Sequence, residues 1–596
     1  METLIPKPSL FHSCHNSGFR KIPVNSRPSS SVVSVSRIND AVHELKTKVT
    51  PKRRNSESLT PDSRKPSSAP DLLEKVFRTL ENGIIKFLDP PLQESADPRF
   101  VLSDNFAPVG EVSPTECEVV HGSIPTCLEG VYIRNGPNPQ FAQSGPYHFF
   151  DGDGMVHAVK IFRGRATFCS RFVKTNKYLH EHRIKSTLVP NLIVGVRGLG
   201  PFVARAALFA AQVVSGKYDI GKGIGVANTS IFSLGGNLYA LCESDLPYAI
   251  EVKDDGDVVT LGRHDFDGQL STNMTAHPKT DPATNETFAF RCGATRPYLT
   301  YFWFDSNGNK QPDVPIFSMN YPSLTHDLAI TGKYAIVCEI QMGANPGNLV
   351  RGGRLVDVNR EKVSRIGVLP RYAKDESEMR WFEVAGFNIF HAVNAWDETD
   401  EHGGDVVVLV APNILSVEHF FERPDLIRGS MEKVTINVET GVVSRHRLST
   451  AKMEFPVINP AYVAKKNKYV YVAVFEESPI KSKMMRASGV AKLDIAASEG
   501  SNVEHECTVG SRMYGDNCFG GEPFFIAREP DNPDSEEDDG FVVSYVRDES
   551  SGVSSFMVMD AQTPNLEVVA VVKLPQRVPY GLHGTFIRAT PTTLLK

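Results

Sequence analysis

Short apolar runs recur along the chain from about Cys117 onward, separated by turn residues. Gly236-Asn237 precedes one such run at 238–241, and the polar stretch 305–308 separates 301–304 from 314–317. Further runs of the same kind follow at 334–337, 405–410, 434–438, 469–475, 541–546, 556–559 and 566–572. Short strands joined by Gly, Asn and Asp turns predict an all-β sandwich, barrel or propeller. No fixed repeat period selects among these three architectures.

Two stretches have helical periodicity instead. In the first, Asp71 and Glu74 have the spacing of a capping box, and Asp89-Pro90-Pro91 ends the helix. Its apolar face consists of Leu73, Val76, Phe77, Leu80, Ile84 and Leu88. This face could pack on the main domain or lie on a lipid surface, and the pattern alone leaves both readings open.

The second helical stretch, 189–215, is rich in Leu, Val, Phe and Ala but contains Arg197 and Arg205. These arginines argue against a membrane span and are compatible with an interfacial helix. The sequence contains no run of about eighteen uncharged apolar residues, so no membrane span is expected.

The first seventy residues differ in composition from the rest. They contain 14 serines and 12 Lys or Arg against 5 acidic residues. This composition is typical of a plastid or mitochondrial transit peptide, and the apolar core of a secretory signal is missing. A disordered basic tail is the alternative. We therefore divide the chain into a leader (1–70), an amphipathic helical segment (71–100) and a main domain (101–596).

Composition narrows the classes of function. The net charge of −6 argues against a nucleic-acid partner. The nine cysteines include no Cys-x-x-Cys pair, which excludes a zinc ribbon and argues against a disulfide scaffold. A length of 596 residues is compatible with one large domain or with several.

Histidines are the candidate metal-binding residues of the main domain. A buried imidazole needs a partner for each ring nitrogen, and a metal on one with a carboxylate on the other satisfies both. Charged neighbours predict a surface position for His180, His182, His264, His402, His446 and His505. Apolar or small neighbours mark His148, His157, His277, His326, His391, His419 and His583. A single buried histidine is usually a satisfied core residue, whereas four that converge would indicate a metal site.

Seven motifs together resemble the carotenoid cleavage oxygenases, in the order that this family shows. They are 130–139 (GVYIRNGPNP), 148–157 (HFFDGDGMVH), 275–279 (TAHPK), 325–327 (THD), 390–396 (FHAVNAW), 520–524 (GGEPF) and 578–583 (VPYGLH). Three further stretches, 127–132 (CLEGVY), 244–249 (SDLPYA) and 316–319 (IFSM), are similar to the plant plastidial carotenoid cleavage dioxygenase 4 class. The 9-cis-epoxycarotenoid dioxygenases are the nearest rival class.

This resemblance implies a seven-bladed β-propeller with a few helices that form a lipid-facing cap. It implies one Fe(II) per chain, bound on the propeller axis by four histidines. By motif, these are His277, His326, His391 and His583, while His148 and His157 belong to a different family motif. Three outer glutamates that accept hydrogen bonds from the histidine rings match Glu243, Glu454 and Glu522.

The implied chemistry is dioxygen-dependent cleavage of a carotenoid or apocarotenoid double bond. Four neutral imidazoles leave two positions of an octahedral iron open. No side chain is needed as an acid or base, so we assign no catalytic residue. The 34 Phe and 17 Tyr are compatible with an apolar tunnel that shelters the reaction. We expect cleavage at the 9,10 (9′,10′) bond, releasing a C13 ketone such as β-ionone.

Two other functions remain open at this point. The chain could be a 9-cis-epoxycarotenoid dioxygenase that makes the abscisic acid precursor, or a non-enzymatic propeller that binds partners. We expect a plastid enzyme that associates peripherally with a membrane or plastoglobule surface and takes a carotenoid and O2 as its substrates.

Overall fold

The computed structural model describes residues 72–187, 189, 195–475, 485–497 and 506–589, and most of their secondary structure is antiparallel β-strand. The leader (1–70) and Asp71 of the capping box lie outside these residues. The predicted all-β class is confirmed, since the apolar runs form strands whose alternate side chains pack between neighbouring sheets.

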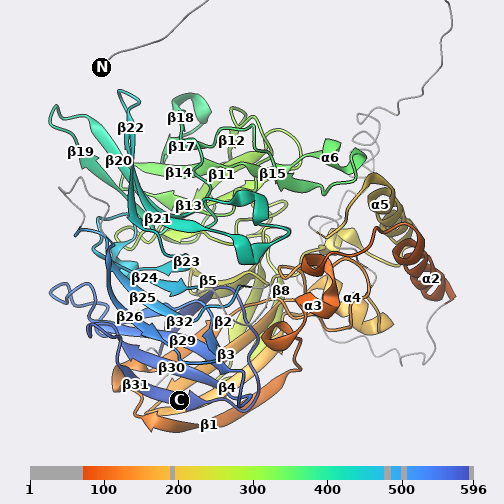
Figure 1. The fold of residues 1–596 in the computed structure, drawn as a ribbon, viewed down its shortest axis with the longest axis horizontal. Helices are drawn as coiled ribbons and strands as arrows, with labels where there is room; N and C mark the ends of the chain where they lie inside the picture. The colour runs from red at the N-terminus through yellow and green to blue at the C-terminus, as the bar shows by residue number, and fades with distance from the viewer. Residues whose placement is uncertain (1–71, 188, 190–194, 476–484, 498–505, 590–596) are drawn as a thin grey trace, which may run out of the picture. The chain divides into compact units, whose positions relative to one another are not determined.

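Five four-stranded antiparallel sheets follow one another along the chain (Figure 1). The first two consist of β5 (Ser230–Leu234), β6 (Asn237–Leu241), β7 (Tyr248–Val252) and β8 (Val258–Arg263), and of β9 (Lys279–Thr280), β10 (Thr287–Cys292), β11 (Leu299–Phe304) and β12 (Val314–Ile316). The next two consist of β13 (Leu328–Ile330), β14 (Tyr334–Glu339), β17 (Arg365–Pro370) and β18 (Arg380–Glu383), and of β19 (Asn394–Thr399), β20 (Asp405–Ile414), β21 (Gly429–Asn437) and β22 (Val443–Ser449). The fifth consists of β23 (Met453–Val457), β24 (Tyr469–Val474), β25 (Gly489–Asp494) and β26 (Thr508–Met513).

A ten-stranded sheet supplies two more blades. One blade is β28 (Phe524–Ala527), β29 (Gly540–Asp548), β30 (Ser554–Asp560) and β31 (Val568–Lys573), with β27 (Cys518–Gly520) also paired to β29. The other is β32 (Gly584–Arg588), β2 (Gly130–Arg134), β3 (Met155–Phe162) and β4 (Arg165–Phe172), and β1 (Val112–Gly122) joins β31 to β4. The pairing of β32 with β2 brings both ends of the domain into one blade. Five sheets and these two blades form a seven-bladed propeller, as the resemblance implies.

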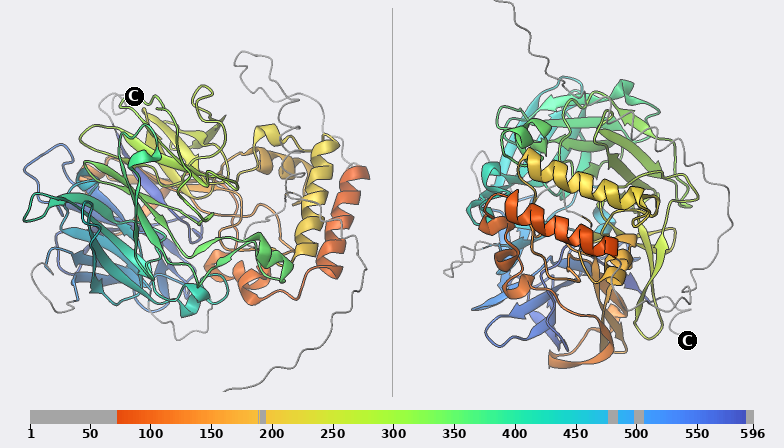
Figure 2. Two further views of the ribbon diagram at one scale, coloured as in Figure 1. Left: turned by 90° about the horizontal axis from the view of Figure 1, so that it is seen from above. Right: turned by 90° about the vertical axis from the view of Figure 1, so that its right-hand side faces the viewer.

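Helices gather on one side of the propeller (Figure 2). They are α2 (Leu72–Phe87), α3 (Pro98–Val101), α4 (Asn176–Ile184), α5 (Leu199–Val214) and α6 (Pro346–Val350). Helix α6 lies between β15 (Met342–Ala344) and β16 (Val356–Val358), an excursion from the sheet of β14 and β17 that reaches α5. Within the described part of the chain, no helix is both long and apolar enough to cross a bilayer.

The apolar face of α2 divides into a buried part and an exposed part. Phe77 and Ile84 pack with Leu208 of α5, whereas most of the remaining apolar side chains of α2 are exposed. Arg205 of α5 is buried and forms ion pairs with Glu81 (2.9 Å) and Asp89 (2.6 Å). These ion pairs therefore connect α5 to α2 and to the residues just beyond α2. The outer surface of the helix pair carries mainly apolar side chains.

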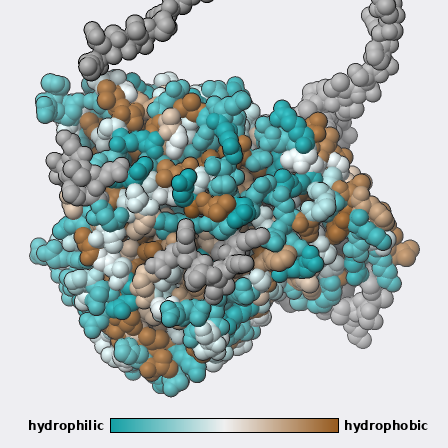
Figure 3. Space-filling model, viewed as in Figure 1, coloured by the Kyte–Doolittle hydropathy of each residue, from teal (hydrophilic) through white to brown (hydrophobic). Residues whose placement is uncertain are grey.

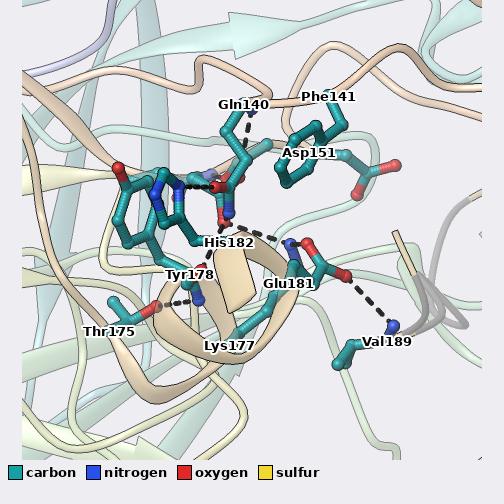
Figure 4. A network of polar contacts seen from close by, with 12 residues as sticks. Gln140, Phe141, Asp151, Thr175, Lys177, Tyr178, Glu181, His182 and Val189 are labelled. Atoms are coloured by element: carbon teal, nitrogen blue, oxygen red, sulfur yellow. Dashed lines mark hydrogen bonds and ion pairs between the residues drawn. The ribbon is translucent and has the colours of Figure 1, made fainter. Parts of the chain in front are cut away.

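A buried polar cluster lies at α4 (Figure 4). Lys177 Nζ lies 2.8 Å from Glu181 Oε2 and 3.1 Å from Asp153 Oδ1. The second oxygens of these carboxylates accept hydrogen bonds from the backbone N–H groups of Val189 and Gln140. Burial opposes the charge of Lys177, but the two carboxylates outweigh it and raise its pKa. We call these three side chains, with the neighbouring, partly buried Asp151, the α4 cluster.

Candidate metal centre

The seven predicted site residues come from seven different blades. His277, His326, His391 and His583 each lie just before the first strand of a blade, namely β9, β13, β19 and β32. The three glutamates come from the other blades: Glu243 follows β6, Glu454 lies in β23, and Glu522 precedes β28. First strands of successive blades lie against one another around the axis, so their ends bring residues that are far apart in sequence together.

The four histidine side chains converge on one point. One ligand nitrogen from each ring lies within 4.8 Å of the others. His277 and His326 approach most closely, with their Nε2 atoms 2.9 Å apart. The ring of His277 also lies 4.4 Å from that of His583 and 5.1 Å from that of His391.

Three of the rings turn their other nitrogen toward a glutamate. His391 Nδ1 is 2.6 Å from Glu454 Oε2, and His583 Nδ1 is 2.7 Å from Glu522 Oε1. His326 Nδ1 is 2.6 Å from Glu243 Oε1, but this contact is not aligned as a hydrogen bond. An Nδ1–H that faces a carboxylate leaves Nε2 with its lone pair directed toward the other rings.

The pKa values of the rings and carboxylates report how closely these groups are packed. Burial, followed by the other rings, lowers the pKa of His277 and of His391 well below the usual value. Burial also opposes protonation of His326, but Glu243 outweighs it and raises the pKa of that ring. Burial raises the pKa of Glu454 to about 7.

This donor set fits a divalent transition metal. Three Nε2 atoms are directed to the centre by their Nδ1 contacts, and in the described part of the chain the buried His391 Nε2 has no hydrogen-bond partner. The facing lone pairs of these rings repel one another unless a cation lies between them. Imidazole suits iron, copper, nickel and zinc, and the glutamates would partly offset a double positive charge.

Apolar surfaces surround the centre. The ring of Phe390 lies 4.8 Å from that of His326, and the ring of Phe455 lies 5.7 Å from that of His391. A cavity of about 270 Å³ borders His277, His391 and His583 and is lined mainly by residues in or next to the first strands of the blades.

Aromatic side chains continue from Phe390 to Phe420, Phe150 and Phe149. Phe390 stacks on Phe420 at 4.8 Å and lies 6.0 Å from Phe150, which contacts Phe149. Sequence reasoning gave these phenylalanines no individual role. The sequence feature that could have identified them is their position next to family motifs. Phe149 and Phe150 lie inside the 148–157 motif, and Phe390 directly precedes His391.

The remaining candidate histidines lie elsewhere. His148 packs against Phe149, and burial lowers its pKa to about 3. His157 is buried against Phe168, and His419 is partly exposed at the surface. The predicted surface position of His180 is wrong, since it is buried in α4 against Tyr218. Its charged neighbour Glu181 is buried as well, in the ion pair with Lys177, whereas His182 and Arg183 are exposed. Flanking residues do not reveal which of these helix positions face inward.

Comparison with known proteins places the chain among carotenoid oxygenases. The family model described as retinal pigment epithelial membrane protein (RPE65) matches residues 106–588. The chain is 52% identical over 580 residues to a probable carotenoid cleavage dioxygenase 4 of Arabidopsis thaliana, covering 94% of this chain and 95% of that protein. It is 51% identical over 518 residues to a chloroplastic 9-cis-epoxycarotenoid dioxygenase of Oryza sativa. This match covers 85% of this chain and 79% of that protein.

Two further relatives have a bond position in their names. A zeaxanthin 7,8(7′,8′)-cleavage dioxygenase of Crocus sativus is 48% identical over 373 residues, covering 62% of this chain and 97% of that protein. A carotenoid 9,10(9′,10′)-cleavage dioxygenase of Pisum sativum is 38% identical over 530 residues, covering 87% and 94%.

The fold has close counterparts among solved structures. A Glu150Gln mutant of the Synechocystis apocarotenoid oxygenase, numbered in that protein, superposes with a TM-score of 0.66 at 26% identity. The match covers 83% of this chain and 100% of that one.

Proposed function

The chain belongs to the RPE65/carotenoid cleavage oxygenase family, and on that premise we propose that it is an Fe(II)-dependent dioxygenase of plastid carotenoids or apocarotenoids. The proposed reaction joins one O2 to a carbon–carbon double bond and yields two carbonyl products. Convergence of His277, His326, His391 and His583 on one point is the observation that carries the proposal.

The four rings would hold one iron, which supplies the site where dioxygen is bound and reduced by the electrons of the alkene. Glu454 and Glu522 orient His391 and His583 by accepting their Nδ1–H groups, and Glu243 lies beside His326. The rings of Phe390 and Phe455 exclude water from the face of the centre. The aromatic run from Phe390 to Phe149 suits a polyene, which packs well against rings and needs no polar partner.

Metal analysis separates this proposal from a non-enzymatic propeller. Protein purified after expression with iron should contain about one iron per chain and should consume O2 with a carotenoid. A well-folded chain that takes up no iron would support the binding module instead.

We further propose cleavage of the 9,10 (9′,10′) bond. Resemblance to the dioxygenase 4 class and the name of the pea relative support this position, whereas the name of the crocus relative points to 7,8. All-trans β-carotene or its apocarotenoids should yield β-ionone. Exclusive turnover of 9-cis-epoxycarotenoids would assign the chain to the epoxycarotenoid class, and products without a C13 ketone would exclude the 9,10 position.

We propose that α2, α5 and α6 dock on a lipid surface, because the substrate is dissolved in lipid. Hydrophobic residues gather at the right-hand margin of the view in Figure 3, where Figure 1 draws α2 and α5. The exposed apolar side chains of these helices are Leu72, Leu73, Val76, Leu80, Phe87, Leu199, Val203, Val214 and Val350. An apolar surface of this kind, with basic side chains such as Lys75 and Lys86 beside it, is typical of interfacial helices.

Liposome flotation tests the docking surface. Leu80→Glu combined with Val203→Glu should abolish flotation with vesicles of plastid galactolipid, and salt should release little of the wild-type protein. Val442→Glu, on the exposed turn between β21 and β22, is the matched control and should float like the wild type. Unchanged flotation of the double variant would place the docking surface elsewhere.

A fusion of residues 1–70 to a reporter should enter isolated chloroplasts if the leader is a transit peptide.

A further inference from the structure

Asp327 borders the same cavity as His277, His391 and His583. Its side chain is 1% exposed, and it immediately follows His326. Three donors converge on its two oxygens. Leu328 N–H donates to Oδ1 at 2.7 Å, Ala392 N–H donates to Oδ2 at 2.9 Å, and the Lys279 ammonium lies 3.0 Å from both oxygens.

These donors belong to three different blades. Lys279 is two residues after His277, Leu328 is two residues after His326, and Ala392 directly follows His391. One carboxylate therefore connects the segments that hold three of the four converging histidines. Thr275 adds a second link between two of them, since its hydroxyl donates to the backbone oxygen of His326 and accepts from the N–H of His277.

The fourth histidine is held differently. Gly584 N–H donates to Glu522 Oε2, while the other oxygen of that glutamate accepts from the His583 ring. In addition, Asn135 N–H donates to the backbone oxygen of His583. The segment of His583 thus has its own support from β2 and Glu522, whereas the other three share Asp327.

We propose that Asp327 is a positioning residue that sets the relative placement of His277, His326 and His391 and thereby the affinity of the centre for iron. This inference rests on the proposed function. A carboxylate suits the role because all three of its partners are donors, and buried donors without acceptors are costly. An asparagine would offer one oxygen to three donors and would direct its own NH2 group at one of them.

Asp281 provides a matched control. It is also a buried aspartate that accepts from a cation and a backbone N–H, with Arg371 at 2.7 Å and Ala283 N–H at 2.8 Å. The Asp281–Arg371 pair links the same two sheets as Asp327 and Lys279, but it contacts none of the four histidine segments through these bonds. Asp281→Asn should therefore lower stability without moving the metal affinity.

The test measures metal binding to the full chain. Wild type, Asp327→Asn, Asp281→Asn and Lys279→Gln are titrated with Fe(II) under anaerobic conditions against a chelator, and their Co(II) forms are compared by visible absorption. Asp327→Asn should weaken iron binding about 10–100-fold, the range typical of residues that orient metal ligands. It should also alter the cobalt spectrum. Lys279→Gln, whose side chain is 24% exposed, should fold and weaken binding several-fold.

The outcomes separate the two proposals. Wild-type protein without iron would overturn the proposed function and this inference with it. Iron affinities of Asp327→Asn and Lys279→Gln within twofold of the wild type would overturn the inference alone. If Asp327→Asn does not fold, the iron affinity of Lys279→Gln alone tests the inference. Equal losses of affinity in Asp327→Asn and Asp281→Asn would also overturn it, because general destabilisation would then account for both.

Discussion

The axial centre and the α4 cluster are both buried groups of ionisable side chains, but they differ in whether the protein itself supplies a cation. In the α4 cluster the ammonium of Lys177 lies between the carboxylates of Asp153 and Glu181, so the opposite charges compensate one another within the protein. At the axial centre, one nitrogen from each of four histidine rings converges on the same point, and His391 Nε2 has no protein partner among the described residues. The first arrangement is complete as a structural anchor, whereas the second is suited to a cation from solution.

Removing a histidine should have the largest effect. His391→Ala should abolish cleavage and lower iron affinity by more than the ~100-fold typical of outer-shell changes, since one of four ligands is lost. The metal-free protein should lose stability only through the broken Nδ1–H contact to Glu454, so its melting temperature should fall modestly. Metal analysis and calorimetry check both points, with His446→Ala in β22 as the control. Near-normal turnover in His391→Ala would remove this residue from the centre.

Lys177→Met should show the reverse pattern. Removing one partner of a buried charge cluster typically costs about 3–5 kcal/mol, because Asp153 and Glu181 are left without their cation. Denaturant unfolding should register this loss, while the iron affinity of the protein that remains folded stays within about twofold of the wild type. A large drop in iron affinity without a loss of stability would contradict the separation of the two regions.

The outer glutamates should show a smaller, graded effect. Glu522→Gln should reduce iron affinity or rate roughly 10–100-fold, since Glu522 supports both His583 and Gly584. Glu243→Gln should cost less, because its contact with His326 is not aligned as a hydrogen bond. Chelator competition measures both variants. Wild-type affinity and rate in Glu522→Gln would remove this glutamate from the outer shell.

The smallest expected effect concerns pH and Asp151 in the α4 cluster. Burial raises the pKa of Asp151 from its ordinary 3.8 to about 7. The unfolded chain therefore releases this proton at lower pH than the folded chain, and the wild type loses stability as the pH rises from about 4 to 7. Asp151→Asn cannot ionise and should therefore be the more stable protein at pH 8. The difference should disappear near pH 4.

Unfolding midpoints of the two proteins at pH 4, 6 and 8 check this prediction. Asp151→Asn should keep the acceptor for His148 N–H, so that only the charge differs. A pH-independent difference between the proteins would show that Asp151 does not hold its proton in the folded state.

Local sequence was sufficient for the strands and for the helix beginning near residue 72. Period-two and helical patterns are properties of neighbouring residues, and motif likeness supplied His277, His326, His391 and His583 together with their glutamates. The choice of a propeller over a sandwich or barrel came from the resemblance alone, because strand patterns do not encode how sheets are placed around an axis.

Only the tertiary structure decided how these residues meet. Glu243 pairs with His326, although the blade that carries His277 lies between their two blades in the sequence. Residue spacing alone does not show which blades lie close enough for such a pair. The inward turn of His180 and Arg205 likewise depends on which helix face packs against which neighbour. The role of Asp327 depends on the same kind of information, because its donors Lys279 and Ala392 lie 48 and 65 residues away and become neighbours only when the first strands converge.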